Sequence, residues 1–167
     1  MNLQFSMPVR IIAGRGAIES FGTEVEKRGK RLFLVAGRQS AVANGKVKAA
    51  LQDLKGVEVE ICETSGREPD VEFVDGCVQR AIAFKCDVVA GIGGGSVLDT
   101  AKAVSGLVNE KDFKTVADYL EIDGNRKPGA CGVPFIAVPT TAGTGAEVTK
   151  NSVIFNGKTA AKRSFRS

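Results

Sequence analysis

The sequence contains no histidine and no tryptophan, and it has only one tyrosine among its 167 residues. Without histidine the chain cannot form a Ser-His-Asp or Cys-His catalytic site, and it cannot bind a metal ion through imidazole. No basic stripe is interleaved with aromatic residues, so the sequence gives no indication of nucleic-acid binding. We therefore predict no histidine-dependent catalytic residue and no histidine metal ligand in this chain.

Long apolar runs and targeting signals are also lacking. No run approaches the ~18 apolar residues that a membrane-spanning helix needs. The N-terminal residues MNLQFSMPVR do not combine a basic stretch with a following apolar one, as a secretory signal would. We expect a cytoplasmic protein without a membrane partner. The proportions of 43% hydrophobic and 25% charged residues are typical of a globular domain.

The four cysteines, Cys62, Cys77, Cys86 and Cys131, form neither a CxxC pair nor a metal-ligand spacing. We expect them to be buried free thiols that pack as small hydrophobic side chains.

Acidic residues are absent after Glu147, but five basic residues follow it: Lys150, Lys158, Lys162, Arg163 and Arg166. This cluster could be a patch for an anionic ligand. It could also be a solvated pair of strands whose acidic partners lie in sequence beyond this chain. For most of the five we favour the second interpretation.

Predicted strands and helices alternate along the chain. The segments 31–37, 57–62, 87–92 and 134–139 are predicted to be strands, with 31–37 a continuous apolar run and 134–139 another buried strand, and amphipathic patterns between the segments predict helices. Two short extended runs within 3–14 precede them, and Asn156-Gly157 predicts a C-terminal β-hairpin. The pattern indicates an α/β fold over residues 1–167, a doubly wound and mostly parallel Rossmann-like sheet with ligands at the carboxyl ends of its strands.

The motif GIGGGSVLDTAK spans residues 91–102, where a predicted strand meets a predicted helix. Gly93, Gly94 and Gly95 lack Cβ atoms, so the turn can adopt positive φ and approach a bulky anion closely. Ser96 is placed to be the N-cap of the helix, with Asp99 completing a capping box. A helix N-terminus of this kind binds diphosphate. The alternative is a tight turn without a ligand, which would not require three consecutive glycines.

The motif PTTAGTGAEVT spans residues 139–149 and follows another predicted strand. Its four hydroxyl side chains, Thr140, Thr141, Thr144 and Thr149, suit the oxygens of ribose, carboxamide and phosphate groups. The alternative is a threonine-rich loop that only caps the next turn. Because both motifs follow parallel strands, we expect them to meet at one edge of the sheet.

Together with MPVRIIAGRGAIESFG, these two motifs closely resemble the N-terminal domain of the iron-containing (group III) alcohol dehydrogenases. The resemblance implies a dinucleotide-binding domain for NAD(P), followed in the family by a helical domain that this chain lacks. It places Gly94, Gly95 and Ser96 at the cofactor diphosphate, Thr140, Thr141 and Thr144 near adenine and ribose, and Thr149 near the diphosphate or nicotinamide. By the same resemblance, Asp99 supports the loop, and Asn151 and Lys162 lie near the nicotinamide ribose.

The resemblance also implies a metal, iron(II) or zinc, bound in the complete enzyme by one Asp and three His of the helical domain. We therefore expect this chain alone to be inactive toward the small alcohol or aldehyde substrate of that enzyme, which could be a homo-oligomer. Many relatives have an acidic residue where this chain has Gly37, followed by Arg38. A 2′-phosphate would meet no repulsion there, so we favour NADP over NAD. A stand-alone nucleotide-binding module and a dehydroquinate-synthase-like lyase remain alternatives.

Overall fold

The computed structural model describes residues 9–129 and 132–166, and its centre is a parallel four-stranded sheet. The strands are β1 (Arg31–Gly37), β2 (Glu58–Thr64), β3 (Val88–Gly93) and β4 (Phe135–Pro139). Their order is β2-β1-β3-β4, and each neighbouring pair is parallel. The predicted α/β fold with a parallel sheet is confirmed.

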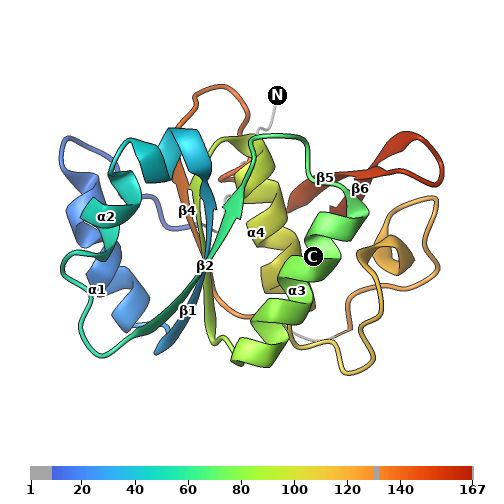
Figure 1. The fold of residues 1–167 in the computed structure, drawn as a ribbon, viewed down its shortest axis with the longest axis horizontal. Coiled ribbons are helices and arrows are strands. Elements are labelled where there is room, and N and C mark those ends of the chain that lie inside the picture. Colours follow the sequence, from blue (N-terminus) through green and yellow to red (C-terminus); the bar gives the residue numbers. More distant parts are fainter. Residues whose placement is uncertain (1–8, 130–131, 167) are drawn as a thin grey trace, which may run out of the picture.

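Helices cover both faces of this sheet (Figure 1). The 3-10 helix η1 (Ala17–Ser20), α1 (Phe21–Glu26) and α2 (Lys46–Leu51) lie on one side, and α3 (Val71–Phe84) and α4 (Gly95–Leu107) lie on the other. The π-helix η2 (Arg38–Ala43) follows β1, and the 3-10 helix η3 (Val116–Tyr119) follows α4. None of the described helices combines the length and the apolar character needed to cross a membrane.

The central strand β1 is apolar and buried at every position after Arg31. Leu32 and Leu34 pack in the cluster that contains α1 and α2 residues, whereas Phe33 and Val35 pack in the cluster of α3 and α4. Because successive side chains of a strand point to opposite faces, a strand covered on both faces needs an apolar residue at every position.

The predicted C-terminal hairpin is confirmed as β5 (Asn151–Asn156) and β6 (Ala161–Arg166), which pair antiparallel. Ile154 and Phe165 bury their side chains in the α3/α4 cluster, so the hairpin extends the layer on that side of the sheet (Figure 1). The turn is longer than a two-residue Asn-Gly turn: Asn156 pairs with Ala161, and Ala160 has a left-handed φ of 50°.

Two other sequence predictions are wrong. Three of the C-terminal cations have acidic partners within this chain, because Lys162 pairs with Glu68, Arg163 with Asp123 and Arg166 with Glu121. Folding brings these acids beside the hairpin, although each acid precedes its basic partner by 40 residues or more in the sequence.

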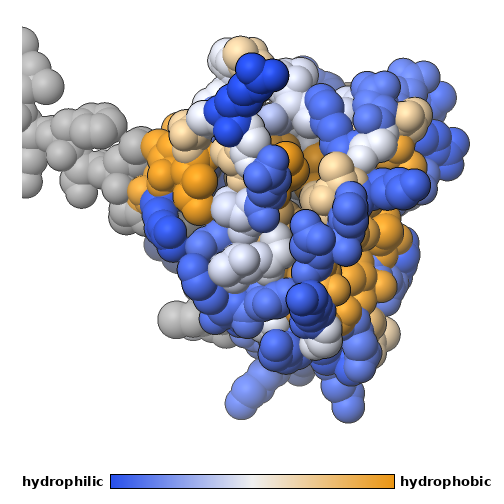
Figure 2. All heavy atoms as spheres, turned by 90° about the vertical axis from the view of Figure 1, so that its left-hand side faces the viewer, coloured by the Kyte–Doolittle hydropathy of each residue, from blue (hydrophilic) through white to orange (hydrophobic). Residues whose placement is uncertain are grey.

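The extended run at 9–13 is not a strand. These residues instead line a groove of about 670 Å³ together with residues of β4, η1 and α1. Val9, Ile11 and Ile12 are exposed there. Figure 2 shows the α1/α2 side of the molecule, where apolar residues reach the surface among hydrophilic ones. The run at 3–8 lies outside the described residues.

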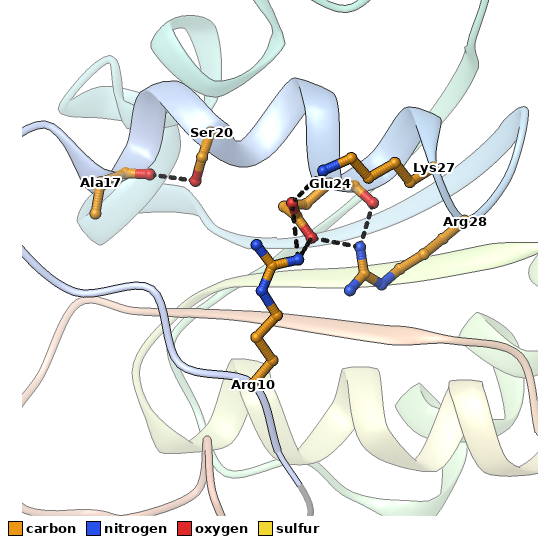
Figure 3. A network of polar contacts seen from close by, with 6 residues as sticks. All are labelled: Arg10, Ala17, Ser20, Glu24, Lys27 and Arg28. Atoms are coloured by element: carbon orange, nitrogen blue, oxygen red, sulfur yellow. Dashed lines mark hydrogen bonds and ion pairs between the residues drawn. The ribbon is translucent and has the colours of Figure 1, made fainter.

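A buried carboxylate joins this N-terminal segment to α1 (Figure 3). Glu24 is only 7% exposed, and it accepts hydrogen bonds from Arg10 Nη1, Lys27 Nζ and Arg28 Nη1 at 2.7–3.2 Å. Hydrogen bonds from Arg28 and then Lys27 lower the pKa of Glu24 to about 2.

The cysteines behave largely as predicted. Cys62, Cys77 and Cys86 are buried and free, and Cys131 lies outside the described residues. The Sγ atoms of Cys62 and Cys77 lie 3.0 Å apart, where β2 packs on α3. Burial raises the pKa of Cys86 to about 12, which keeps this thiol protonated at neutral pH.

Candidate functional site

The candidate site lies where the carboxyl ends of β1 and β3 meet. These two strands are neighbours, with Ala36 opposite Ile92, and the chain leaves them toward opposite faces of the sheet. Such a switch point leaves a crevice beyond the strand ends, which is the usual ligand site of doubly wound folds. Gly37 ends β1 and Gly93 ends β3.

The glycine turn is compact because side chains fill the space around it. A Cβ atom on Gly93 would lie 2.5 Å from Cγ2 of Val97. The expectation that this turn uses positive φ is wrong, because Gly93, Gly94 and Gly95 are not among the residues with positive φ. Gly94 is extended, with φ −81° and ψ −173°. The glycines are thus required by close packing rather than by a left-handed backbone.

The threonine loop packs directly against this turn, as predicted. A Cβ atom on Gly94 would lie 3.3 Å from Oγ1 of Thr141, and one on Gly95 would lie 3.3 Å from Cγ2 of Thr144. The backbone N–H of Thr140 donates to the carbonyl of Gly93 at 2.9 Å. The structure therefore brings the two motifs together at the start of α4.

The predicted capping box is wrong by two residues. Gly94 is the N-cap of α4 and no side chain caps the helix, so Ser96 lies within the first turn. Gly95 and Ser96 then begin the helix with N–H groups that have no intrahelical acceptor. Backbone donors of this kind, with no Cβ at Gly94 or Gly95, suit an approaching anion.

The carboxylate of Asp99 contacts β5 and Lys102. One carboxylate oxygen accepts from the backbone N–H of Val153 at 3.1 Å, and the other pairs with Lys102 Nζ at 3.0 Å. Lys102 in turn donates to the Thr149 hydroxyl at 3.4 Å and to the carbonyl of Asn151. Sequence analysis did not select Lys102, since its position only continues the helical pattern.

Four buried polar side-chain atoms in the described structure have no hydrogen-bond partner in the protein: one is Oε2 of Glu147, in the threonine loop, and the other three lie at or near strand ends. These three are Oγ1 of Thr64, Oγ1 of Thr140 and Oδ1 of Asn151. Buried polar atoms are almost always paired, so atoms without a partner indicate positions where a polar ligand or water completes the bonding. Thr64 ends β2 opposite Gly37. No signal in the sequence marked it, because the predicted strand over 57–62 stops two residues earlier.

A glycine-rich helix start, a packed threonine loop and unpaired polar atoms are what a dinucleotide site requires. Consistent with this, the family described as iron-containing alcohol dehydrogenase matches residues 8–167.

The chain belongs to the iron-containing alcohol dehydrogenase family.

Individual relatives agree with this assignment. The chain is 33% identical to sulfoacetaldehyde reductase of Bilophila wadsworthia over 158 residues, which cover 92% of this chain and 39% of that protein. It is 34% identical to the NADPH-dependent butanol dehydrogenase of Clostridium saccharobutylicum over 164 residues, covering 96% and 40% of the two chains. The crystal structure of NADH-dependent butanol dehydrogenase A from Thermotoga maritima matches with a TM-score of 0.87 and 30% identity, covering 99% and 41%. The chain thus spans about 40% of the length of these relatives.

The surroundings of Gly37 and Arg38 bear on the predicted cofactor preference. A Cβ atom on Gly37 would lie 2.4 Å from Oγ of Ser40, so the close approach of Ser40 favours glycine here. Arg38 Nε pairs with Oε2 of Glu63 at 3.2 Å, and both side chains are exposed. Any anion that Arg38 binds must therefore compete with this carboxylate.

Asn151 and Lys162 are not brought together. They lie on different strands of the hairpin, with Asn151 opposite Arg166 at its open end and Lys162 opposite Phe155 near its turn. Lys162 pairs with Glu68, which precedes α3.

A metal does not fit the described residues. No group of three or more Cys, Asp or Glu side chains within 9–129 and 132–166 is placed to hold a metal ion. The larger cavity, about 930 Å³, lies at the opposite end of α4 beside Ser105 and Gly106. The candidate dinucleotide site is an open edge of the sheet.

Proposed function

We propose that this chain is a single NAD(P)-binding domain, residues 1–167, of a cytoplasmic metal-dependent alcohol dehydrogenase that interconverts an alcohol with an aldehyde or ketone. The observation that carries the proposal is the cradle formed by Gly94 and Gly95 against Thr141 and Thr144 at the N-terminus of α4. The names of the relatives, which include a butanol dehydrogenase and a sulfoacetaldehyde reductase, support an alcohol or aldehyde substrate.

Each part of the cradle has a role in this proposal. The N–H groups of Gly95 and Ser96 bind the diphosphate, aided by the helix dipole. Thr140 and Asn151, whose Oγ1 and Oδ1 atoms lack partners, pair with hydroxyl or amide groups of the cofactor. The bound nicotinamide would accept or donate the hydride, and the protein orients it. No step is assigned to a metal, because the described residues do not form a site for one.

Titration of the chain with NADPH and NADH tests the cradle. Gly94→Val places a branched side chain where the diphosphate approaches and where Thr141 Oγ1 is already close. We expect the Kd to rise about tenfold, equal to about 1.4 kcal/mol. The matched control is Gly76→Val on α3, because a Cβ atom there meets nothing within 4 Å. Equal Kd values for the parent and a folded Gly94→Val protein would move the diphosphate site elsewhere.

We further propose a preference for NADP over NAD. Gly37 presents no carboxylate to repel a 2′-phosphate, and Arg38 offers a charge-assisted hydrogen bond to it. Glu63 opposes this preference, because it already pairs with Arg38. Of the relatives named above, the butanol dehydrogenase of Clostridium saccharobutylicum is NADPH-dependent and that of Thermotoga maritima is NADH-dependent, so the family membership leaves the choice open.

The Arg38–Glu63 pair provides the test of cofactor preference. Arg38→Ala should weaken NADPH binding about tenfold and leave NADH nearly unchanged, because a hydrogen bond to a charged group contributes about 1.5–3 kcal/mol. Glu63→Gln should act in the opposite direction and tighten NADPH binding. If neither variant changes the ratio of the two Kd values, the end of β1 does not recognise the 2′ position.

A further inference from the structure

Between β4 and β5 the chain has no helix or strand, although this loop supplies Thr140, Thr141, Thr144 and Thr149. Gly143 and Gly145 both adopt positive φ, so the loop turns twice within a few residues. A loop with little regular backbone hydrogen bonding keeps its side chains in fixed positions only if contacts with other segments hold it in place. Its entrance is anchored at Gly93, to which Thr140 N–H donates.

Lys102 anchors the other end of the loop. Its residue is 6% exposed, and its Nζ reaches the carbonyl of Thr149 at 3.3 Å, the Thr149 hydroxyl at 3.4 Å and the carbonyl of Asn151. An ammonium group has three N–H donors, and here they point at oxygens of the loop end and at Asp99. Separating this buried ammonium group from its partners would cost free energy, because a buried charge without partners is strongly unfavourable.

Asp99 completes the anchor from the same face of α4. Its carboxylate accepts from Val153 N–H at 3.1 Å, and its backbone carbonyl accepts from the Ser152 hydroxyl at 2.6 Å. Lys102 follows Asp99 by three residues, so the two side chains are neighbours on the helix. Helix α4, which begins at the glycine turn, therefore holds residues 149–153 through these hydrogen bonds, at the point where the loop ends and β5 begins.

We propose that Asp99 and Lys102 form a buried clamp, with Lys102 as a positioning residue that holds the threonine loop against the glycine turn. Lys102 acts through Thr149 and Asn151 and does not contact the cofactor. The expected effect on cofactor affinity rests on the proposed function, whereas the effect on the loop itself does not.

Hydrogen–deuterium exchange of the ligand-free chain tests the clamp directly. Lys102→Met keeps the length of the side chain and removes its charge and donors. We expect exchange of backbone amides within 141–151 to accelerate about tenfold, while exchange in β1 and β3 stays unchanged. Lys102→Arg, which keeps the donors, should restore most of the protection. Unchanged exchange in Lys102→Met would overturn the proposal.

A matched control is available on α1. Lys27 also follows its acid by three residues, but it is 56% exposed and far from the loop in the sequence. Lys27→Met removes the same charge from the chain and should leave exchange within 141–151 unchanged. If Lys27→Met accelerates amide exchange within 141–151 as much as Lys102→Met does, the effect comes from general destabilisation. That result would overturn the proposed clamp.

Cofactor titration then measures the consequence. The Kd for NADPH should rise about fivefold in Lys102→Met and return toward the parent value in Lys102→Arg. If the parent chain binds no nicotinamide cofactor, the proposed function fails while hydrogen exchange still decides the clamp. If the loop loosens and the Kd stays constant, loop position does not set affinity and that part of the proposal is wrong. Should Lys102→Met not fold, Asp99→Asn weakens the same ion pair and should change exchange and Kd in the same direction.

Discussion

Helices α1 and α4 show the same local pattern, an acidic residue followed three positions later by a lysine, which is the C-cap residue in α1 and an internal residue in α4. In α1, Lys27 pairs with Glu24 and remains 56% exposed, and Arg10 and Arg28 join the same carboxylate. In α4, the side chains of Lys102 and Asp99 are only 7% and 14% exposed. Both pairs are i,i+3 ion pairs, yet their surroundings differ completely.

The difference shows that burial, rather than the pattern itself, decides what such a pair does. Glu24 is a buried acid surrounded by cations that largely reach solvent, so it fastens the segment at Arg10 to α1 (Figure 3). Lys102 is a buried cation whose remaining donors reach backbone carbonyls of a distant loop. The first network holds a surface segment, and the second lies beside the candidate site.

The largest effect should come from removing the acid of the buried pair. Asp99→Ala leaves the Lys102 ammonium without a counter-charge and Val153 N–H without its acceptor. We expect the free energy of unfolding to fall by about 3 kcal/mol, since breaking a buried ion pair from one side is strongly destabilising. Urea denaturation measures it. A loss below about 1 kcal/mol would place this pair with ordinary surface pairs.

The matching change on α1 should affect stability without affecting the site. Glu24→Gln removes the charge that three cations share, so the melting temperature should fall. The Kd for NADPH should stay within about twofold of the parent value, because distant sites usually act independently. A thermal melt and a cofactor titration of the same preparation check both statements. A marked loss of affinity would contradict the separation of the two networks.

The pH dependence of stability should distinguish Glu24 further. Its pKa is about 2 in the folded chain, below its ordinary value of 4.5, because Arg28 and Lys27 donate to the ionised carboxylate. The network therefore stabilises the fold fully above about pH 4.5 and loses this contribution as the pH falls toward 2. The difference in melting temperature between the parent and Glu24→Gln should shrink over this range. A constant difference would contradict the lowered pKa.

The smallest effect should come from Arg10. Its side chain is 62% exposed, so its ion pair with Glu24 is screened by water. Arg10→Ala should lower the melting temperature by about 2 °C or less, while Arg28 and Lys27 keep Glu24 paired. A drop as large as that of Glu24→Gln would mean that Arg10 is the main partner of this carboxylate.

Much of the fold was predictable because it follows from local patterns. Uninterrupted apolar runs such as 31–37 indicated strands buried on both faces, and Asn156-Gly157 indicated the hairpin. The meeting of the two motifs was also predictable, since carboxyl ends of parallel strands share one edge. The family resemblance named the same motifs, and the match over residues 8–167 confirms the family.

The sequence by itself therefore determined the order of elements, the place of the glycine and threonine motifs and the family. Only the tertiary structure decided that Gly94 rather than Ser96 caps α4 and that close contacts, not positive φ, require the glycines. It also revealed Lys102, whose partners lie 47 and 49 residues further along the chain. Periodicity and turn signals report on neighbours in sequence, whereas these contacts depend on which side chains the packed layers bring together.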